Sequence, residues 1–227
     1  MKRFNDMNAT KPLNFILIGR SGSGKGTQAK LLMEHFGNLF YISTGDLFRD
    51  LAKAGTDAGN RVYKVLTEGG LPYDDLATTL WMHEIAYKMK TDHGLVADGF
   101  PRRLNEAKDL DQFLEFLERK ENTFNILIDI SREEAFNRLS KRRICKGCGR
   151  VIPWLGALKD LNACDKCGGE LAARPDDVPE AINNRLDYYE ERVIEVVNHY
   201  KERGRLIKIN GEQRIEDVFQ DILKALR

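Results

Sequence analysis

A glycine-rich segment, placed between an apolar run and a helical stretch, constrains the fold of this chain more than any other feature. The apolar run NFILI at 14–18 is followed by GRSGSGKGT at 19–27 and then by QAKLLMEHF at 28–36. A strand that passes through such a turn into a helix points backbone N–H groups and the helix dipole at one place, where phosphate oxygens are stabilised. Glycine is needed because side chains would block the approach of the phosphate. The segment therefore predicts an α/β fold with a phosphate-binding loop.

The residue types within this loop have separate tasks. Lys25 is placed to reach the β- and γ-phosphates of a nucleotide, and a hydroxyl that follows it ligates Mg²⁺ directly or through water. The common pattern has Ser or Thr directly after the lysine, whereas in this chain Gly26 intervenes and Thr27 supplies the hydroxyl. The other loop residues expected to contact ATP are Gly22, Ser23 and Gly24.

Short apolar runs recur along the chain between amphipathic stretches, and this alternation is typical of a parallel sheet with helices on both faces. We expect five strands, at 14–18, 40–42, 95–97, 124–130 and 206–209. Helical periodicity is clearest at 105–120. A longer helix is expected from Pro179 to Arg203, with Gly204 as its stop, and a last helix at 215–226.

Two stretches interrupt the alternation of strands and helices. Residues 43–73 are helical in pattern but contain no strand, and residues 141–177 hold every cysteine. Both are expected as insertions in one core domain, and the core is then formed by residues 13–42, 74–140 and 178–227.

The composition excludes several classes of protein. The chain is 42% hydrophobic and 31% charged, which is ordinary for a globular protein. A net charge of +1 gives no general field for a polyanion, and no run approaches the roughly 18–20 apolar residues of a membrane span. Residues 1–12 lack the apolar segment of a secretory signal and are expected to form a flexible extension. We therefore expect a cytoplasmic protein without a membrane or nucleic-acid partner.

The four cysteines form two close pairs, Cys145 with Cys148 and Cys164 with Cys167, in the pattern C-x2-C-x15-C-x2-C. Four thiolates at this spacing suit tetrahedral Zn²⁺, and a full set of protein ligands leaves no open position for catalysis. A structural zinc ion is expected, because the segment has too few apolar residues to build a core alone. Iron in the same four thiolates and a redox pair are the alternatives.

Four motifs, in the same order along the chain, resemble those of the adenylate kinases and related nucleoside monophosphate kinases. They are GKGT in the loop, ISTGDLFR at 42–49, DGFPR at 98–102, and RPDD at 174–177 followed by Arg185. The resemblance implies a monomer that transfers the γ-phosphoryl group of MgATP reversibly to AMP, giving two ADP. It also implies that the cysteine-containing insertion closes as a lid over ATP and that the helical insertion binds the monophosphate.

Phosphoryl transfer asks of a protein mainly positioning and cancellation of charge, and arginine suits both tasks because its planar cation binds phosphate bidentately. The resemblance implies a catalytic set of Lys25, Arg102, Arg142, Arg174 and Arg185. The ATP contacts that it implies beyond the loop are Arg138, Arg142, Val151, Ile152 and Gln213. The monophosphate contacts that it implies are Thr44, Arg49, Gly70, Leu71, Pro72, Gly99, Arg102, Glu106, Arg174 and Arg185.

Carboxylates complete the expected site. Asp98 ends the apolar run LVAD, where it can organise Mg²⁺ or its waters together with Thr27. Asp129 ends a second apolar run and is the alternative, although the resemblance favours Asp98. Asp176 and Asp177 either pair with the arginines or cap the following helix.

The chain departs from the family pattern where the base of the monophosphate is read. Four residues after Arg102 the family has a glutamine, which accepts from the adenine amino group and donates to N1, whereas this chain has Glu106. An ionised carboxylate only accepts, so the donors of guanine or cytosine suit it as well, and a GMP or CMP kinase is one alternative. Thr44 matches the adenine-selective members. Pro72 also lies one position earlier than the proline of the family loop.

A second alternative belongs to a different class of protein. The basic run Lys141-Arg142-Arg143 lies directly beside the cysteine pairs, as in a zinc ribbon that grips nucleic acid. A nucleic-acid-dependent ATPase would combine this ribbon with the phosphate-binding loop. Such a protein would hydrolyse ATP faster with nucleic acid, whereas a monophosphate kinase hydrolyses ATP slowly without its acceptor.

Overall fold

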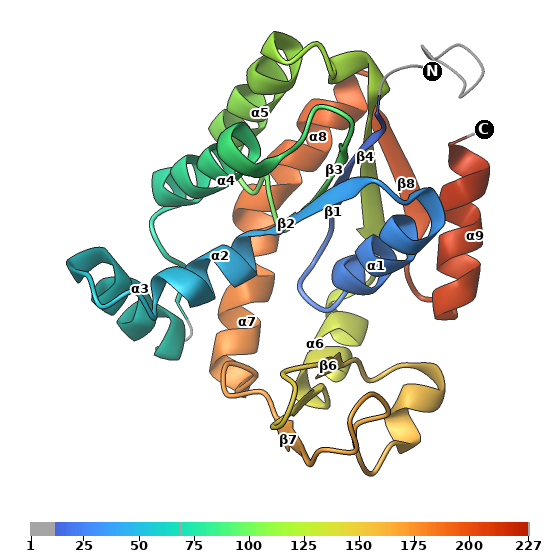
Figure 1. Ribbon diagram of the computed structural model, residues 1–227. Coiled ribbons are helices and arrows are strands. Elements are labelled where there is room, and N and C mark those ends of the chain that lie inside the picture. The colour runs from blue at the N-terminus through green and yellow to red at the C-terminus, as the bar shows by residue number, and fades with distance from the viewer. Residues whose placement is uncertain (1–11, 69, 227) are drawn as a thin grey trace.

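Five parallel strands form the centre of the molecule (Figure 1) in the computed structural model, which describes residues 12–68 and 70–226. The strands are β1 (Asn14–Ile18), β2 (Leu39–Ser43), β3 (Gly94–Asp98), β4 (Thr123–Asp129) and β8 (Leu206–Asn210). They pair in the order β2-β3-β1-β4-β8, and every pair is parallel. The predicted five-stranded parallel sheet is confirmed. The extension expected at 1–12 lies, except for Pro12, outside the described residues.

Helices cover both faces of this sheet (Figure 1). One face packs against α1 (Lys25–Phe36) and α9 (Ile215–Ala225), and the other against α4 (Asp74–Lys88), α5 (Leu104–Phe116) and α8 (Ile194–Glu202). Alternate residues of β1 point to opposite faces of the sheet. Phe15 and Leu17 pack on the face that α1 and α9 cover, and Ile16 and Ile18 pack on the other face. Burial on both faces explains why this strand is continuously apolar.

The helix predicted at 179–203 is continuous and runs from the sheet to the cysteine-containing insertion (Figure 1). It consists of α7 (Pro179–Tyr188), a π-helical turn η4 (Tyr189–Val193) and α8. Pro179 lies in the first turn, and Gly204, with φ of 63°, follows its end, as the sequence predicts. Its first part packs on α6 (Arg132–Ser140) through Ile182 and Leu186.

The helix predicted at 105–120 ends earlier than its apolar periodicity indicates. α5 stops at Phe116, and the backbone of Glu118 turns into the left-handed region with φ of 54°. The N–H of Arg119 then bonds to the carbonyl of Leu114, which closes the helix end. Lys120–Asn122 forms a separate 3₁₀ turn, η2.

Two segments project from the sheet, and we name them for use below. The helical insertion follows β2 and contains α2 (Thr44–Leu51) and α3 (Asp57–Thr67). The cysteine segment lies between α6 and α7 and contains β5 (Arg143–Cys145), β6 (Val151–Ile152), the 3₁₀ helix η3 (Gly156–Asp160) and β7 (Leu171–Ala173). Its strands form an antiparallel sheet in the order β6-β5-β7. Across residues 12–68 and 70–226, none of the helices combines the length and apolarity that crossing a membrane requires.

Candidate active site

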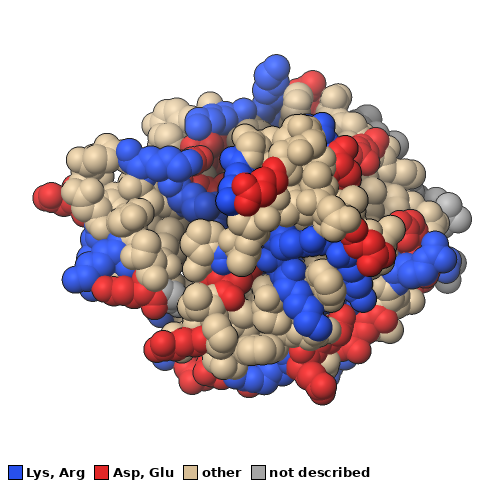
Figure 2. All heavy atoms as spheres, turned by 90° about the horizontal axis from the view of Figure 1, so that it is seen from below, with Lys and Arg blue, Asp and Glu red and all other residues tan. Residues whose placement is uncertain are grey.

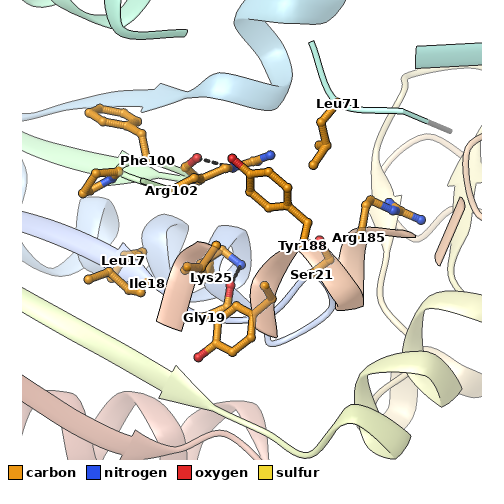
Figure 3. A pocket seen from close by; sticks show the side chains of 14 residues that line it. Leu17, Ile18, Gly19, Ser21, Lys25, Leu71, Phe100, Arg102, Arg185 and Tyr188 are labelled. Atoms are coloured by element: carbon orange, nitrogen blue, oxygen red, sulfur yellow. Dashed lines mark hydrogen bonds between the residues drawn. The ribbon is translucent and has the colours of Figure 1, made fainter. Parts of the chain in front are cut away.

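The glycine-rich loop joins the end of β1 to the start of α1, as the sequence predicts. Gly19 and Gly22 have φ values of 150° and 84°, which favour glycine. A Cβ on Gly19 would lie 2.5 Å from the carbonyl oxygen of Ile128, so a side chain would also collide with β4. Lys25 folds back across the loop, and its Nζ donates to the carbonyls of Gly19 and Arg20 at 2.8 and 2.9 Å (Figure 3).

Two adjoining hollows open beside this loop. The larger, of about 440 Å³, is lined by the loop, the segment 99–102 after β3, and the long helix (Figure 3). The smaller, of about 290 Å³, extends toward the helical insertion. They share Leu71, Gly99, Arg102 and Tyr188. The predicted site residues that line one or both are Lys25, Thr44, Leu71, Pro72, Gly99, Arg102, Glu106 and Arg185.

Positive charge converges on the larger hollow. Burial lowers the pKa of Lys25 to about 8, and the cations of Arg102 and Arg142 push it the same way, whereas Asp98 opposes them. Arg102 is held by its Nε donation to the carbonyl of Gly99 at 2.6 Å. Lys and Arg side chains also gather near the middle of the face that Figure 2 shows. Several cationic side chains close together favour binding of a polyanionic ligand at this hollow.

Asp98 lies at the same edge of the sheet as the loop, because the register pairs it with Leu17 of β1. Its Oδ2 accepts from the hydroxyl of Tyr41 at 3.2 Å, and burial raises the pKa of Asp98 while Lys25 lowers it. A Cβ on Gly26 would lie 3.2 Å from this Oδ2, tighter than an ordinary contact. Gly26 therefore lets the carboxylate approach the loop, which gives the GKGT form a physical reason.

Asp129, the alternative carboxylate, has other partners. It ends β4 and lies 2.8 Å from the Nζ of Lys208 and 3.6 Å from a guanidinium nitrogen of Arg20. Its charge is therefore balanced by two cations, whereas Asp98 faces Lys25 of the loop. Asp98, and not Asp129, is therefore the carboxylate that interacts with Lys25.

Asp177 joins two of the predicted arginines. Its carboxylate accepts two bonds from Arg142, at 2.7 and 2.8 Å, and one from Arg185 at 2.7 Å. Asp176 pairs with Arg174, whose Nε lies 2.6 Å from its Oδ1. The alternative that these carboxylates cap the next helix is wrong, because the N-cap of α7 is Val178 and both carboxylates bond to arginines instead. The RPDD motif is thus an arginine-orienting turn.

Several predicted contacts lie outside the two hollows. Arg49 is exposed and pairs with Asp46 on α2 at 2.5 Å. Arg138 is buried and donates to Glu134 and to the carbonyl of Gly211. The other predicted residues that line neither hollow are Gly22, Ser23, Gly24, Gly26, Thr27, Gly70, Asp98, Arg142, Val151, Ile152, Arg174 and Gln213.

Glu106 lines the smaller hollow, and only 5% of it is exposed. Its Oε1 accepts from the indole N–H of Trp81 at 3.0 Å, and its Oε2 accepts from the backbone N–H of Arg102 at 2.5 Å. Burial raises the pKa of Glu106, although its hydrogen bonds from the backbone of Arg102, the indole of Trp81 and the backbone of Arg103 favour the ionised form. Trp81 is fully buried, and its bond to Glu106 depends on a contact between α4 and α5 that no sequence pattern indicates.

The four cysteines of the cysteine segment come together as the spacing predicts. All four sulfur atoms lie within 4.8 Å of one another, with Cys145 to Cys167 at 3.5 Å and Cys148 to Cys164 at 3.7 Å. Tetrahedral zinc separates its sulfur ligands by about 3.8 Å, whereas a disulfide requires about 2 Å. The backbone N–H of Cys148 donates to Sγ of Cys145 and lowers the pKa of that thiol, which favours a thiolate there. The residues therefore fit a metal ion.

Comparison with known proteins supports the assignment of these motifs. The model of one family, described as adenylate kinase, matches residues 17–205. An adenylate kinase of Methanocella arvoryzae is 39% identical over 216 residues, which cover 95% of this chain and 99% of the relative. The adenylate kinase of Kosmotoga olearia is also 39% identical, over 94% of this chain and 99% of its own. That of Thermosipho melanesiensis is 36% identical, over 95% and 100%.

Proposed function

Because this chain belongs to the adenylate kinase family, and is therefore a nucleoside monophosphate phosphotransferase, we propose that it transfers the γ-phosphoryl group of MgATP reversibly to AMP, giving two ADP. One observation carries the proposal. The hollow beside Lys25 and the hollow lined by Thr44 and Glu106 meet at Arg102. A donor phosphate at the first and an acceptor phosphate at the second would face each other across that cation.

The loop supplies the donor side. Lys25 and the backbone N–H groups of the loop bind the β- and γ-phosphates, and Thr27 and Asp98 provide the hard oxygen atoms that suit Mg²⁺. The metal neutralises charge on the phosphates when it is bound. Asp98 also faces Lys25, whose pKa it raises against the effect of burial, so the ammonium stays cationic beside the phosphates.

The arginines supply charge cancellation. Arg102 binds the phosphate of the monophosphate, and Arg142 and Arg185 face the transferring group from the start of the cysteine segment and from α7. Asp177 positions both of these side chains through three hydrogen bonds. Arg174 joins them from the end of the cysteine segment. No general base is needed, because the acceptor oxygen already belongs to a phosphate anion.

The insertions complete this proposal. Residues 43–73 bind the monophosphate, and residues 141–177 form a lid that closes over ATP and excludes water that would hydrolyse it. Zinc on the four cysteines stiffens this lid. Arg49, Val151 and Ile152 reach their proposed nucleotide contacts when these parts close, whereas Arg138 and Gln213 belong to the core and would contact ATP from there. One chain supplies both hollows, so we propose a monomer, in the cytoplasm, where thiols remain reduced for the metal.

Parallel initial-rate measurements test the proposal. Phosphoryl transfer from MgATP is measured with AMP, GMP, CMP and UMP, using the wild type and Glu106→Gln. We expect AMP to have the highest kcat/KM, and nucleic acid to leave ATP hydrolysis unchanged when no acceptor is present. A preference for GMP or CMP that Glu106→Gln shifts to AMP would overturn the choice of acceptor. ATP hydrolysis that is stimulated by nucleic acid would overturn the proposed kinase activity.

A further inference from the structure

Trp81 lies behind the hollow that we assign to the monophosphate base. It belongs to α4, is fully buried, and lines neither hollow. Its ring stacks on Phe100, with 5.2 Å between the ring centroids and 8° between the planes. Its Nε1–H donates to Oε1 of Glu106, which α5 carries. One indole of α4 thus contacts both α5 and the segment 99–102, each of which contributes residues to the lining of this hollow.

The hydrogen bonds of Glu106 leave a defined capacity for a ligand. A carboxylate offers about four acceptor positions on its two oxygens. The N–H of Trp81 occupies one position on Oε1, and the backbone N–H of Arg102 occupies one on Oε2. The backbone of Arg103 donates a third hydrogen bond to this carboxylate, so about one of the four positions remains for a ligand, on a side chain that lines the hollow. With both oxygens held, the terminal torsion, which is otherwise broad, has one orientation.

We propose that Trp81 is a positioning residue for the acceptor: its indole N–H orients the Glu106 carboxylate so that a free acceptor position meets the exocyclic amino group of the base. The inference rests on the proposed function, since it takes AMP as the acceptor. Selection of a base with an amino group over one without it then depends on two residues: Glu106, which contacts the base, and Trp81, which does not.

The alternative role for Trp81 is packing alone, and the two roles predict different kinetics. A packing residue affects stability and the whole site alike. A residue that orients an amino-group acceptor affects acceptors that carry the amino group more than acceptors that lack it. The matched probe is purine riboside 5′-monophosphate, which is AMP without its 6-amino group. The quantity to measure is the ratio of kcat/KM for AMP to kcat/KM for this probe.

The first variant is Trp81→Phe, which keeps an aromatic ring against Phe100 but removes the donor. We expect KM for AMP to rise about tenfold, the range for loss of a hydrogen bond to a charged group, with kcat and KM for ATP nearly unchanged. The AMP-to-probe ratio should fall by a similar factor. In a Glu106→Ala background, Trp81→Phe should leave the ratio unchanged, because the pair acts through one contact.

The control variant is Phe113→Leu. Phe113 packs against the same indole, at 6.2 Å between ring centroids, and none of the hydrogen bonds of Glu106 involves it. We expect it to lower thermal stability and to leave the AMP-to-probe ratio at the wild-type value. If Trp81→Phe does not fold, incorporation of 3-benzothienylalanine at position 81 tests the same point, since sulfur replaces only the N–H.

The outcomes separate this inference from the proposed function. A ratio that stays at the wild-type value in Trp81→Phe, or in the benzothienyl variant, would overturn the positioning role whatever the stability. If the wild type prefers GMP, the proposed acceptor is wrong, and the same variants are compared on GMP and IMP, which differ in the 2-amino group. A falling GMP-to-IMP ratio would then support the positioning role, and an unchanged ratio would overturn it.

Discussion

Replacement of Asp177 by asparagine tests whether one carboxylate positions the arginines of the proposed lid and of α7. The side chain of Asp177 is 2% exposed, and those of Arg142 and Arg185, which it joins, are 15% and 14% exposed. Asparagine keeps the size but removes the charge, and its amide NH₂ must face a guanidinium that only donates. Removal of one partner from a buried ion pair costs about 3–5 kcal/mol. Because both arginines retain some contact with water, we expect Asp177→Asn to lower the free energy of unfolding by about 3 kcal/mol, the lower end of that range.

Urea unfolding followed by circular dichroism, with zinc present, measures this loss. The control is Asp176→Asn, because Asp176 pairs with Arg174 at 2.6 Å and only at 3.8 Å with Arg185, and is 33% exposed. Solvent screening weakens the stabilisation that such a pair provides, so we expect the free energy of unfolding to fall by about 1 kcal/mol or less. We also expect kcat of Asp177→Asn to fall at least about tenfold, since two proposed catalytic arginines lose their fixed geometry. Equal losses in the two variants, or an unchanged kcat in Asp177→Asn, would refute the positioning argument.

Three further predictions concern the metal, the pH dependence of stability and Mg²⁺. Removal of zinc by a chelator, or Cys148→Ser, should increase hydrogen exchange in residues 141–177 and leave the five-stranded sheet protected; uniform loss of protection would contradict this. Burial raises the pKa of Glu106, so the folded protein binds more protons than the unfolded one and stability falls as pH rises from the ordinary value of 4.5. The free energy of unfolding of the wild type minus that of Glu106→Gln, measured with urea, should therefore decrease as the pH rises above 4.5. A difference that stays constant or increases would contradict this prediction. Tyr41→Phe removes the hydroxyl bond to Asp98, so the Mg²⁺ concentration for half-maximal rate should rise about threefold at unchanged KM for AMP, and an unaltered Mg²⁺ titration would show that Tyr41 has no such role.

The central sheet was predictable because its strands are buried on both faces. A strand such as β1 must then be apolar throughout, and each of the five predicted runs agrees with its strand to within one residue at either end. The end of α5 was not predictable in the same way. Apolar periodicity continues past Phe116, and the chain leaves the helix only because Glu118 adopts a left-handed conformation. The π-helical turn η4 gave no sequence signal either.

The sequence by itself determined the parts of the site that depend on short spacing along the chain: the phosphate-binding loop, the cysteine ligands and the arginine motifs. Local chemistry is enough for these, because glycine conformation and ligand spacing are properties of a few neighbouring residues. Tertiary structure alone decided which hydrogen-bond donor or cation pairs with each carboxylate of the site. Trp81 meets Glu106 across 25 positions, Arg142 meets Asp177 across 35, and Tyr41 meets Asp98 across 57. Such contacts arise from the packing of separate elements, which no local pattern encodes.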